Sequence, residues 1–254
     1  MLRVEHLRKE YSQITGQRTL AIKDLSFSVE KGQFISIVGP SGCGKTTLLM
    51  CVCALSRPSA GKVFLDGVEV TKPPENMVLV FQEYNKSLLA WRSVLKNVRL
   101  SLEARSGLSR QQMEERARHF IQLVGLSGFE RHYPWELSGG MQQRVAIARA
   151  LACKPEILLM DEPFGSVDAL TRFELEDTLL SLWEQFGNTI LFVTHDLDEA
   201  IYLSDKIYVM TARPSEIMAE LTIELARPRN QLKTRGDPNF IRYRDTIYEM
   251  IREG

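Results

Sequence analysis

The sequence predicts an α/β fold in which a parallel sheet, covered on both faces, is flanked by a smaller antiparallel sheet. The first observation is a series of short, almost uninterrupted apolar runs, which are typical of strands buried on both faces of a parallel sheet. The second is the helical spacing of apolar residues between some of these runs. The third is an alternating apolar and polar pattern in other segments, which predicts antiparallel strands.

The strands follow directly from these patterns. The runs that predict parallel strands are 34–38, 77–81, 157–160, 190–193 and 207–210. The alternating segments that predict antiparallel strands are 2–7, 25–30 and 63–70. Asp66-Gly67 lies inside the last of these segments, and this dipeptide is typical of a hairpin turn.

Helices are also indicated by spacing and by residues at their ends. Apolar residues gather on one face of 111–124, and Gly125 is placed to end that helix. A second helical pattern begins after Asp168 and stops near Gly187. The tail from about residue 226 is rich in arginine and proline before a predicted helix over 239–252, so we interpret it as an appendage and not an independent domain.

Composition limits the classes of function. Lys and Arg number 32, as do Asp and Glu, so bulk charge gives no indication of nucleic-acid binding. The sequence has no apolar run of about 18 residues, so we expect no membrane-spanning helix. The first residues carry mixed charges without a signal-peptide core, and four cysteines do not form a disulfide framework. Both observations predict a protein of a reducing compartment.

A glycine-rich loop follows the first predicted parallel strand and precedes a helical run. Residues 39–46 read Gly-Pro-Ser-Gly-Cys-Gly-Lys-Thr and fit the phosphate-binding pattern G-x-x-x-x-G-K-[ST] in its required context, which predicts a P-loop NTPase. The loop amides and the helix N-terminus attract anionic oxygens. Lys45 is expected to reach the β- and γ-phosphates, and the Thr46 hydroxyl to ligate Mg²⁺. The expected nucleotide-binding residues here are Gly39, Ser41, Gly42, Cys43, Gly44, Lys45, Thr46 and Thr47.

Polar residues follow the carboxyl ends of other predicted strands, where ligands bind in parallel sheets. Asp161 is placed to hold Mg²⁺, and Glu162 to act as the general base for an attacking water. His195 and Gln82 occupy similar positions and are candidates for sensing the γ-phosphate and for binding Mg²⁺ or water. From the residues alone, an ordinary surface role accounts for either of these two equally well.

Ser138 is a natural N-cap for the helix that opens at Leu137-Ser138-Gly139-Gly140-Met141-Gln142-Gln143-Arg144. Together with the phosphate loop and the acidic pair, this segment closely resembles the ATP-binding-cassette (ABC) family, in the family's motif order from about residue 2 to residue 210. The resemblance implies an ABC ATP-binding domain over 1–225 with a helical subdomain at about 84–150. The remainder, 226–254, would be a C-terminal helical extension.

The resemblance gives each candidate a role. The loop 39–46 is similar to Walker A, Asp161 to the Walker B carboxylate and Glu162 to the catalytic base. Gln82 resembles the Q-loop glutamine, His195 the switch histidine, and Ser166-Val167-Asp168 a slightly altered D-loop. The implied catalytic residues are Lys45, Gln82, Glu162 and His195, and the implied magnesium ligands are Thr46, Gln82 and Asp161. Tyr11 resembles the aromatic residue that stacks on adenine, and an ordinary strand aromatic is its alternative.

The resemblance also implies partners. Two copies would enclose two ATP molecules head to tail, with Ser138, Gly139 and Gly140 of each copy completing the other's site. Segments 84–94 and 164–172 resemble the nitrate/sulfonate/taurine branch of ABC importers. That branch implies transmembrane permease subunits, an extracytoplasmic solute-binding protein, no nucleic acid and a peripheral place at the cytoplasmic face of the inner membrane. Permease docking is expected on an apolar patch of Leu88, Leu89 and Trp91, for which a core segment is the alternative.

Other functions account for less of the sequence. A DNA-maintenance ATPase would need long coiled coils between Lys45 and Ser138, but the interval is short and lacks heptads. A small-molecule kinase leaves the segment 137–144 unexplained. A soluble ABC ATPase of an assembly pathway, of the iron–sulfur biogenesis type, stays as the alternative function.

The cysteines provide a competing candidate site. Cys51 and Cys53 lie two positions apart on a predicted helix, about 200° around its axis, so they cannot chelate one metal ion together. Cys43 lies inside the phosphate loop, where backbone amides are expected to lower the pKa of its thiol.

Overall fold

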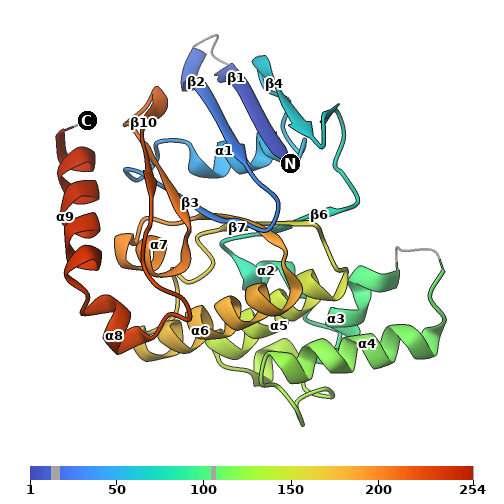
Figure 1. The fold of residues 1–254 in the computed structure, drawn as a ribbon. Coiled ribbons are helices and arrows are strands. Elements are labelled where there is room, and N and C mark those ends of the chain that lie inside the picture. The colour runs from blue at the N-terminus through green and yellow to red at the C-terminus, as the bar shows by residue number, and fades with distance from the viewer. Residues whose placement is uncertain (13–17, 104–106, 254) are drawn as a thin grey trace.

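A ten-stranded sheet with helices against both faces forms the centre of the computed structural model, which describes residues 1–12, 18–103 and 107–253 (Figure 1). The strand order is β5-β4-β1-β2-β10-β9-β3-β8-β7-β6. The strands are β1 (Leu2–Ser12), β2 (Arg18–Val29), β3 (Phe34–Val38), β4 (Ala60–Leu65), β5 (Val68–Glu69), β6 (Met77–Val80), β7 (Ile157–Asp161), β8 (Thr189–Val193), β9 (Lys206–Met210) and β10 (Ser215–Thr222).

The five apolar runs all form strands, as predicted, and β9, β3, β8, β7 and β6 lie parallel to one another. Every residue of β3, β7 and β8 is buried, which explains why these strands are apolar without alternation. Parallel pairing brings the carboxyl ends of β3, β7 and β8 to one edge of the sheet. The residues that follow these strands therefore gather in one place.

The antiparallel region is also confirmed. Strand β1 pairs with β2 and β4, and β4 turns into β5 through Asp66 and Gly67, whose φ angles are +49° and +81°. The two regions form one sheet because β10 pairs parallel with β2 and antiparallel with β9. Strand β10 was not predicted, because Ser215 is its only fully buried residue and it therefore lacks an apolar run.

The helices are α1 (Lys45–Val52), α2 (Tyr84–Ser87), α3 (Val94–Glu103), α4 (Arg110–Leu123), η1 (Pro134–Glu136), α5 (Gly139–Ala152), α6 (Ala169–Phe186), α7 (Leu197–Leu203), α8 (Gln231–Arg235) and α9 (Pro238–Glu253). The predicted helix ends agree well: Gly125 follows α4 with φ +73°, and Gly187 ends α6 with φ +64°. The tail helix is confirmed as α9. Helix α8 was not predicted, because its five residues are too few to show a helical spacing of apolar residues.

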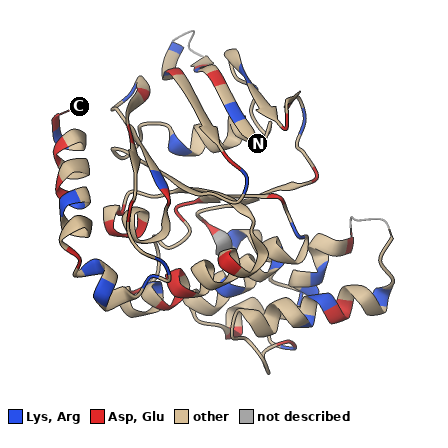
Figure 2. Ribbon diagram, in the orientation of Figure 1, with Lys and Arg blue, Asp and Glu red and all other residues tan. Residues whose placement is uncertain are grey.

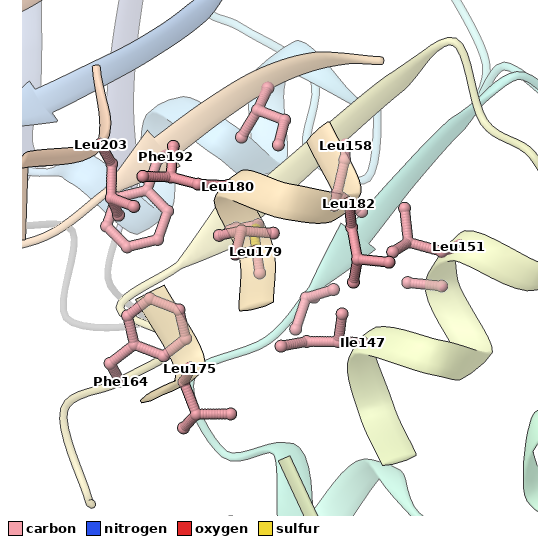
Figure 3. Packing of buried hydrophobic residues seen from close by; sticks show 14 of the residues in the cluster. Ile147, Leu151, Leu158, Phe164, Leu175, Leu179, Leu180, Leu182, Phe192 and Leu203 are labelled. Carbon is pink, nitrogen blue, oxygen red and sulfur yellow. The ribbon is translucent and has the colours of Figure 1, made fainter. Parts of the chain in front are cut away.

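Two apolar clusters fill the faces of the sheet. One packs β-strand residues against α3–α7 and α9, and the other against α1 and the antiparallel strands. Figure 3 shows the first cluster, with Leu182 of α6 next to Leu158 of β7 and Leu175 of α6 next to Phe164. This packing fixes the sheet edge on which the functional residues lie.

Charged residues of both signs are interspersed over the molecule, in keeping with its zero net charge (Figure 2). Among the described residues, no helix combines the length and the apolar character needed to cross a membrane.

Candidate functional site

The phosphate loop connects β3 to α1 in the arrangement that the sequence predicted. Its sharp path depends on Gly44, which has φ +113°, and on Gly39, where a Cβ atom would lie 2.9 Å from the carbonyl oxygen of Met210. The Lys45 Nζ atom folds back to donate to the carbonyl oxygens of Gly39, at 2.9 Å, and Pro40, at 3.1 Å. The ammonium group is therefore held over the loop, with Ser41 and Gly42 exposed beside it.

Cys43 differs from its expectation. Its side chain is 1% exposed and packs in the cluster beneath the loop. Burial raises the pKa of the Cys43 thiol, and this effect exceeds the opposing influence of Lys45 and the loop amides. The prediction of a lowered thiol pKa is wrong, because burial of the thiol outweighs the lowering effect of the loop amides and of Lys45.

Thr46 and Asp161 meet at the first turn of α1. The Thr46 hydroxyl donates to Asp161 Oδ1 at 3.1 Å, and burial raises the pKa of the Asp161 carboxyl. A hollow of about 450 Å³ opens beside them and is lined by Thr46, Phe81, Gln82, Glu83, Lys86, Ser87 and Asp161. All three predicted magnesium ligands thus line one hollow. One carboxylate with a hydroxyl and an amide oxygen fits Mg²⁺, which takes few protein ligands and completes its shell with phosphates and water.

Glu162 is the point at which the candidate catalytic side chains converge. Its Oε2 atom accepts from Gln82 Nε2 at 3.2 Å and lies 2.8 Å from His195 Nδ1. Its Oε1 atom lies 3.9 Å from Lys45 Nζ. The sequence predicted that these residues follow neighbouring strand ends, and the structure brings them together around one carboxylate.

The backbone of Glu162 explains how its side chain reaches this position. Glu162 has φ +42°, a left-handed conformation that is costly for a residue with a Cβ atom. The Glu162 amide donates to the carbonyl of Val193 at 2.8 Å, and the next turn closes through Gly165. The chain therefore departs from strand geometry directly after Asp161, the last residue of β7. No sequence pattern signals this conformation.

The turn that resembles the family's signature lies at the start of α5. Ser138 caps the helix by accepting from the amide of Met141 at 3.3 Å, as predicted, and Ser138 and Gly139 are exposed. Gly140 is buried, and a Cβ atom there would lie 2.4 Å from Thr171 Cγ2 at the start of α6. Ser138 and Gly139 are therefore exposed residues at the N-terminus of α5, and Gly140 packs against α6.

Tyr11 lies near the end of β1, next to the start of α1. Its ring is 43% exposed, and its hydroxyl lies 3.4 Å from Thr47 Oγ1. The Lys9 Nζ atom lies 5.0 Å from the ring centroid. An exposed aromatic ring therefore lies beside the helix that follows the phosphate loop.

The expected docking patch needs a correction. Leu88 is 4% exposed and belongs to the main apolar cluster, so the core alternative holds for this residue. Leu89 is half-buried, whereas Trp91 is 73% exposed. Spacing could not separate these neighbours, because they lie in an irregular segment between α2 and α3.

Several supporting residues were missed by the sequence reasoning. Gln143 is fully buried and donates from Nε2 to the carbonyl of Pro163, which joins α5 to the turn after Glu162. Asp196 caps α7 directly after His195 and pairs with Arg172 at 2.7 Å. The only available signal was the pattern D-x-x-E at Asp196, which is typical of a helix start.

Comparisons with known proteins identify the family of the chain. The family model described as "ABC transporter" matches residues 22–165. An uncharacterized ABC transporter ATP-binding protein of Methanocaldococcus jannaschii is 47% identical over 99% of this chain and 91% of its own length. An aliphatic sulfonates import ATP-binding protein of Bacillus thuringiensis is 43% identical over 90% of this chain and 88% of its own. A nitrate import ATP-binding protein of Synechococcus elongatus is 44% identical over 91% and 85% respectively.

Solved structures show the same fold. The dimeric structure of a bacterial ABC transporter cassette has a TM-score of 0.77 and 32% identity, and it covers 88% of this chain and 99% of the other. A dimeric post-hydrolysis state of that cassette, bound to ADP and Pi, has a TM-score of 0.76 and 30% identity, over 88% of this chain and 99% of that one. The fold, the motif order and these relatives lead to one conclusion: the chain belongs to the ABC transporter ATP-binding family and is an ATPase.

Proposed function

We propose that this chain is the subunit that powers import of a small solute of the nitrate, sulfonate or taurine type by hydrolysing ATP. The observation that carries the proposal is the convergence of Lys45, Gln82 and His195 on Glu162, beside the Thr46–Asp161 pair. Relatives over most of the chain are named as nitrate, aliphatic sulfonates and taurine import ATP-binding proteins. These names favour an importer over the alternative of a soluble assembly ATPase.

In this proposal the chain's own residues perform the phosphoryl chemistry. Lys45 exchanges the carbonyls of Gly39 and Pro40 for the β- and γ-phosphate oxygens, since an anionic partner binds an ammonium more strongly than a neutral one. Glu162 takes the proton of the attacking water, and His195 contacts the γ-phosphate.

Mg²⁺ would be held by Thr46, Asp161 and Gln82 and would neutralise charge on the phosphates. Loop amides from 41 to 47 would bind the phosphate oxygens, and Tyr11 would stack on adenine. The nucleotide-binding part of the chain would span 1–225, with the tail 226–254 appended.

The site would be completed by a second copy. The exposed amides beside Ser138 and Gly139 suit a γ-phosphate that the partner copy holds, and the structural relatives are dimeric. ATP would then join two copies more strongly than ADP, which lacks the γ-phosphate. Such a difference in affinity is what a ligand needs to shift an open–closed equilibrium.

The open–closed cycle would drive permease subunits at the cytoplasmic face of the inner membrane, with cargo delivered by an extracytoplasmic solute-binding protein. After the correction to Leu88, the exposed part of the docking patch is Trp91 with the edge of Leu89. An exposed tryptophan is suited to a protein contact because it contributes a large apolar area at low entropic cost.

Mixing two inactive variants tests the shared site. Ser138→Arg blocks the outward turn, and Glu162→Gln removes the base. Each variant alone should turn over ATP only at a small residual rate. A mixture should regain activity. In a mixed dimer, one of the two ATP sites combines the intact Glu162 of one copy with the intact Ser138 turn of the other. The control mixes Ser138→Arg with the Ser138→Arg/Glu162→Gln double variant, which leaves no intact site. A mixture no more active than its components would contradict the proposal.

A further inference from the structure

The C-terminal segment contacts the helix that directly follows His195. Arg229 donates from Nη1 to the carbonyl oxygens of Ile201, at 2.8 Å, and Tyr202, at 2.6 Å, and from Nη2 to that of Ser204, at 2.7 Å. These carbonyls end α7, where a cation also interacts favourably with the helix dipole. Burial lowers the pKa of Arg229 to about 10, so its guanidinium stays charged at neutral pH.

Arg235, at the end of α8, joins α7 to α6. Its Nη2 atom lies 2.8 Å from Glu176 Oε2, and its Nη1 atom 3.4 Å from Asp198 Oδ2. The Glu176 side chain is fully buried, which makes Arg235 its main compensating charge. The guanidinium also lies 4.7 Å from the ring centroid of Phe173 and 5.2 Å from that of Tyr202. Figure 2 shows the basic positions of α8 close to acidic positions of α6.

Hydrogen bonds link Asp198 to both chain neighbours of His195, which are Thr194 and Asp196. The amide of Asp198 donates to Asp196 Oδ1 at 2.9 Å, and Asp196 Oδ2 pairs with Arg172 at 2.7 Å. The amide of Asp196 donates to Thr194 Oγ1 at 3.0 Å, and that hydroxyl donates to Glu199 at 2.6 Å. The residues before and after His195 are therefore both fixed, whereas its own ring projects to Glu162.

The charges of this region require cations from outside α7. Asp196 caps α7, and its first turn carries Asp198 and Glu199. Burial raises the pKa of Glu199 to about 8, so this carboxyl is mostly protonated at neutral pH and the two aspartates are the anions that need cations. Arg172 approaches from α6 and Arg235 from the tail. Without Arg235, the acidic turn and the buried Glu176 would lose one of these two cations, and α7 would shift to expose them to water.

We propose that Arg235 is a positioning residue: the C-terminal segment holds the first turn of α7 in place and thereby directs the ring of His195 toward Glu162. The consequence for turnover rests on the proposed function, because it assumes that His195 acts in hydrolysis. The position of the His195 ring can be tested without that assumption.

The chain has four histidines, so histidine-selective labelling gives a simple NMR test on the full-length protein. His195→Ala assigns the signal of His195. Arg235→Gln should shift or broaden that signal and leave those of His6, His119 and His132 in place. Asp198→Asn should do the same and keeps the Arg235–Glu176 pair, so it decides the question if Arg235→Gln fails to fold. Lys233→Gln, an exposed neighbour on α8, is the matched control.

Steady-state kinetics then link position to turnover. Arg235→Gln should lower kcat roughly tenfold with KM for ATP unchanged, and should have no further effect in a His195→Ala background. An unchanged His195 signal in the folded variants would overturn the proposal. A displaced signal with normal kcat would support the positioning role and would contradict the role of His195 in the proposed function.

Discussion

The two surfaces that this chain would present to ATP are built differently. The edge that carries Glu162 consists of charged and polar side chains that bind one another, with Lys45, Gln82 and His195 all reaching its carboxylate. The turn at Ser138 and Gly139 consists of small, exposed residues at the N-terminus of α5.

The difference indicates what each surface can do alone. The edge at Glu162 holds side chains of the kinds that move protons and bind phosphates, so in the proposed function it carries the chemistry. The turn at Ser138 offers backbone donors and a helix N-terminus, so it can recognise an anion but cannot activate water. In the proposed head-to-tail pair, each surface would meet the other kind.

The largest effect is expected from removing the base, because this tests whether the edge at Glu162 carries the chemistry. Glu162→Gln keeps the shape of the side chain but cannot take a proton, so kcat should fall by about 10²–10⁴ with ATP binding retained. Titration calorimetry and a phosphate-release assay measure the two quantities. Glu184→Gln, on the exposed side of α6, is the control. Near wild-type turnover in Glu162→Gln would place the base elsewhere.

The charged support behind the edge should make stability depend on pH. Burial raises the pKa of Glu199 to about 8 from an ordinary value of 4.5, so the folded protein binds this proton more tightly than the unfolded chain. The contribution to the free energy of unfolding is present below about pH 4.5 and is lost as pH rises through about 8. It amounts to a few kcal/mol, since one pKa unit corresponds to about 1.4 kcal/mol.

Glu199→Gln should therefore flatten the curve of unfolding free energy against pH in this window, as measured by urea denaturation. An unchanged slope in the variant would show that Glu199 is not the group responsible.

The turn at Ser138 should instead be sensitive to size. A methyl group at Gly140 would lie 2.4 Å from Thr171 Cγ2, so Gly140→Ala should lower the free energy of unfolding by about 1–3 kcal/mol. Thr171→Ser removes that Cγ2 atom and should recover most of the loss in the double variant. Equal thermal stability of Gly140→Ala and the wild type would refute this packing.

The smallest effect concerns adenine. Tyr11→Ala removes the exposed ring beside α1 and should raise KM for ATP by about fivefold, equivalent to about 1 kcal/mol, with kcat unchanged. Tyr11→Phe keeps the ring and should behave as wild type. A normal KM in the alanine variant would favour the ordinary strand aromatic.

Features set by residues close together in the sequence could be predicted from it, and features set by distant contacts could not. Strand runs, caps and the phosphate loop are local signals, so the parallel strands, Ser138 and 39–46 were predictable. Strand β10 was not, because its residues are mostly half-buried or exposed and form no continuous apolar run. The burial of Leu88 depends on which helices pack over it, and such packing is not encoded in a short window.

The same reasoning applies to the site. The order of the strands brought Glu162, Gln82 and His195 together, as expected for parallel strand ends. The positive φ of Glu162 and the pairs Arg172–Asp196 and Arg235–Glu176 depend on contacts across more than twenty residues of sequence. A single sequence shows the charges but not their partners.

Analytical ultracentrifugation of the Glu162→Gln protein tests the central claim most directly, because this variant should bind ATP without cleaving it. With ATP and Mg²⁺ the sedimentation profile should show a dimer, and with ADP and Mg²⁺ a monomer. Adding Ser138→Arg to the same chain should prevent the dimer. A protein that binds ATP at high concentration and still sediments as a monomer would contradict the account.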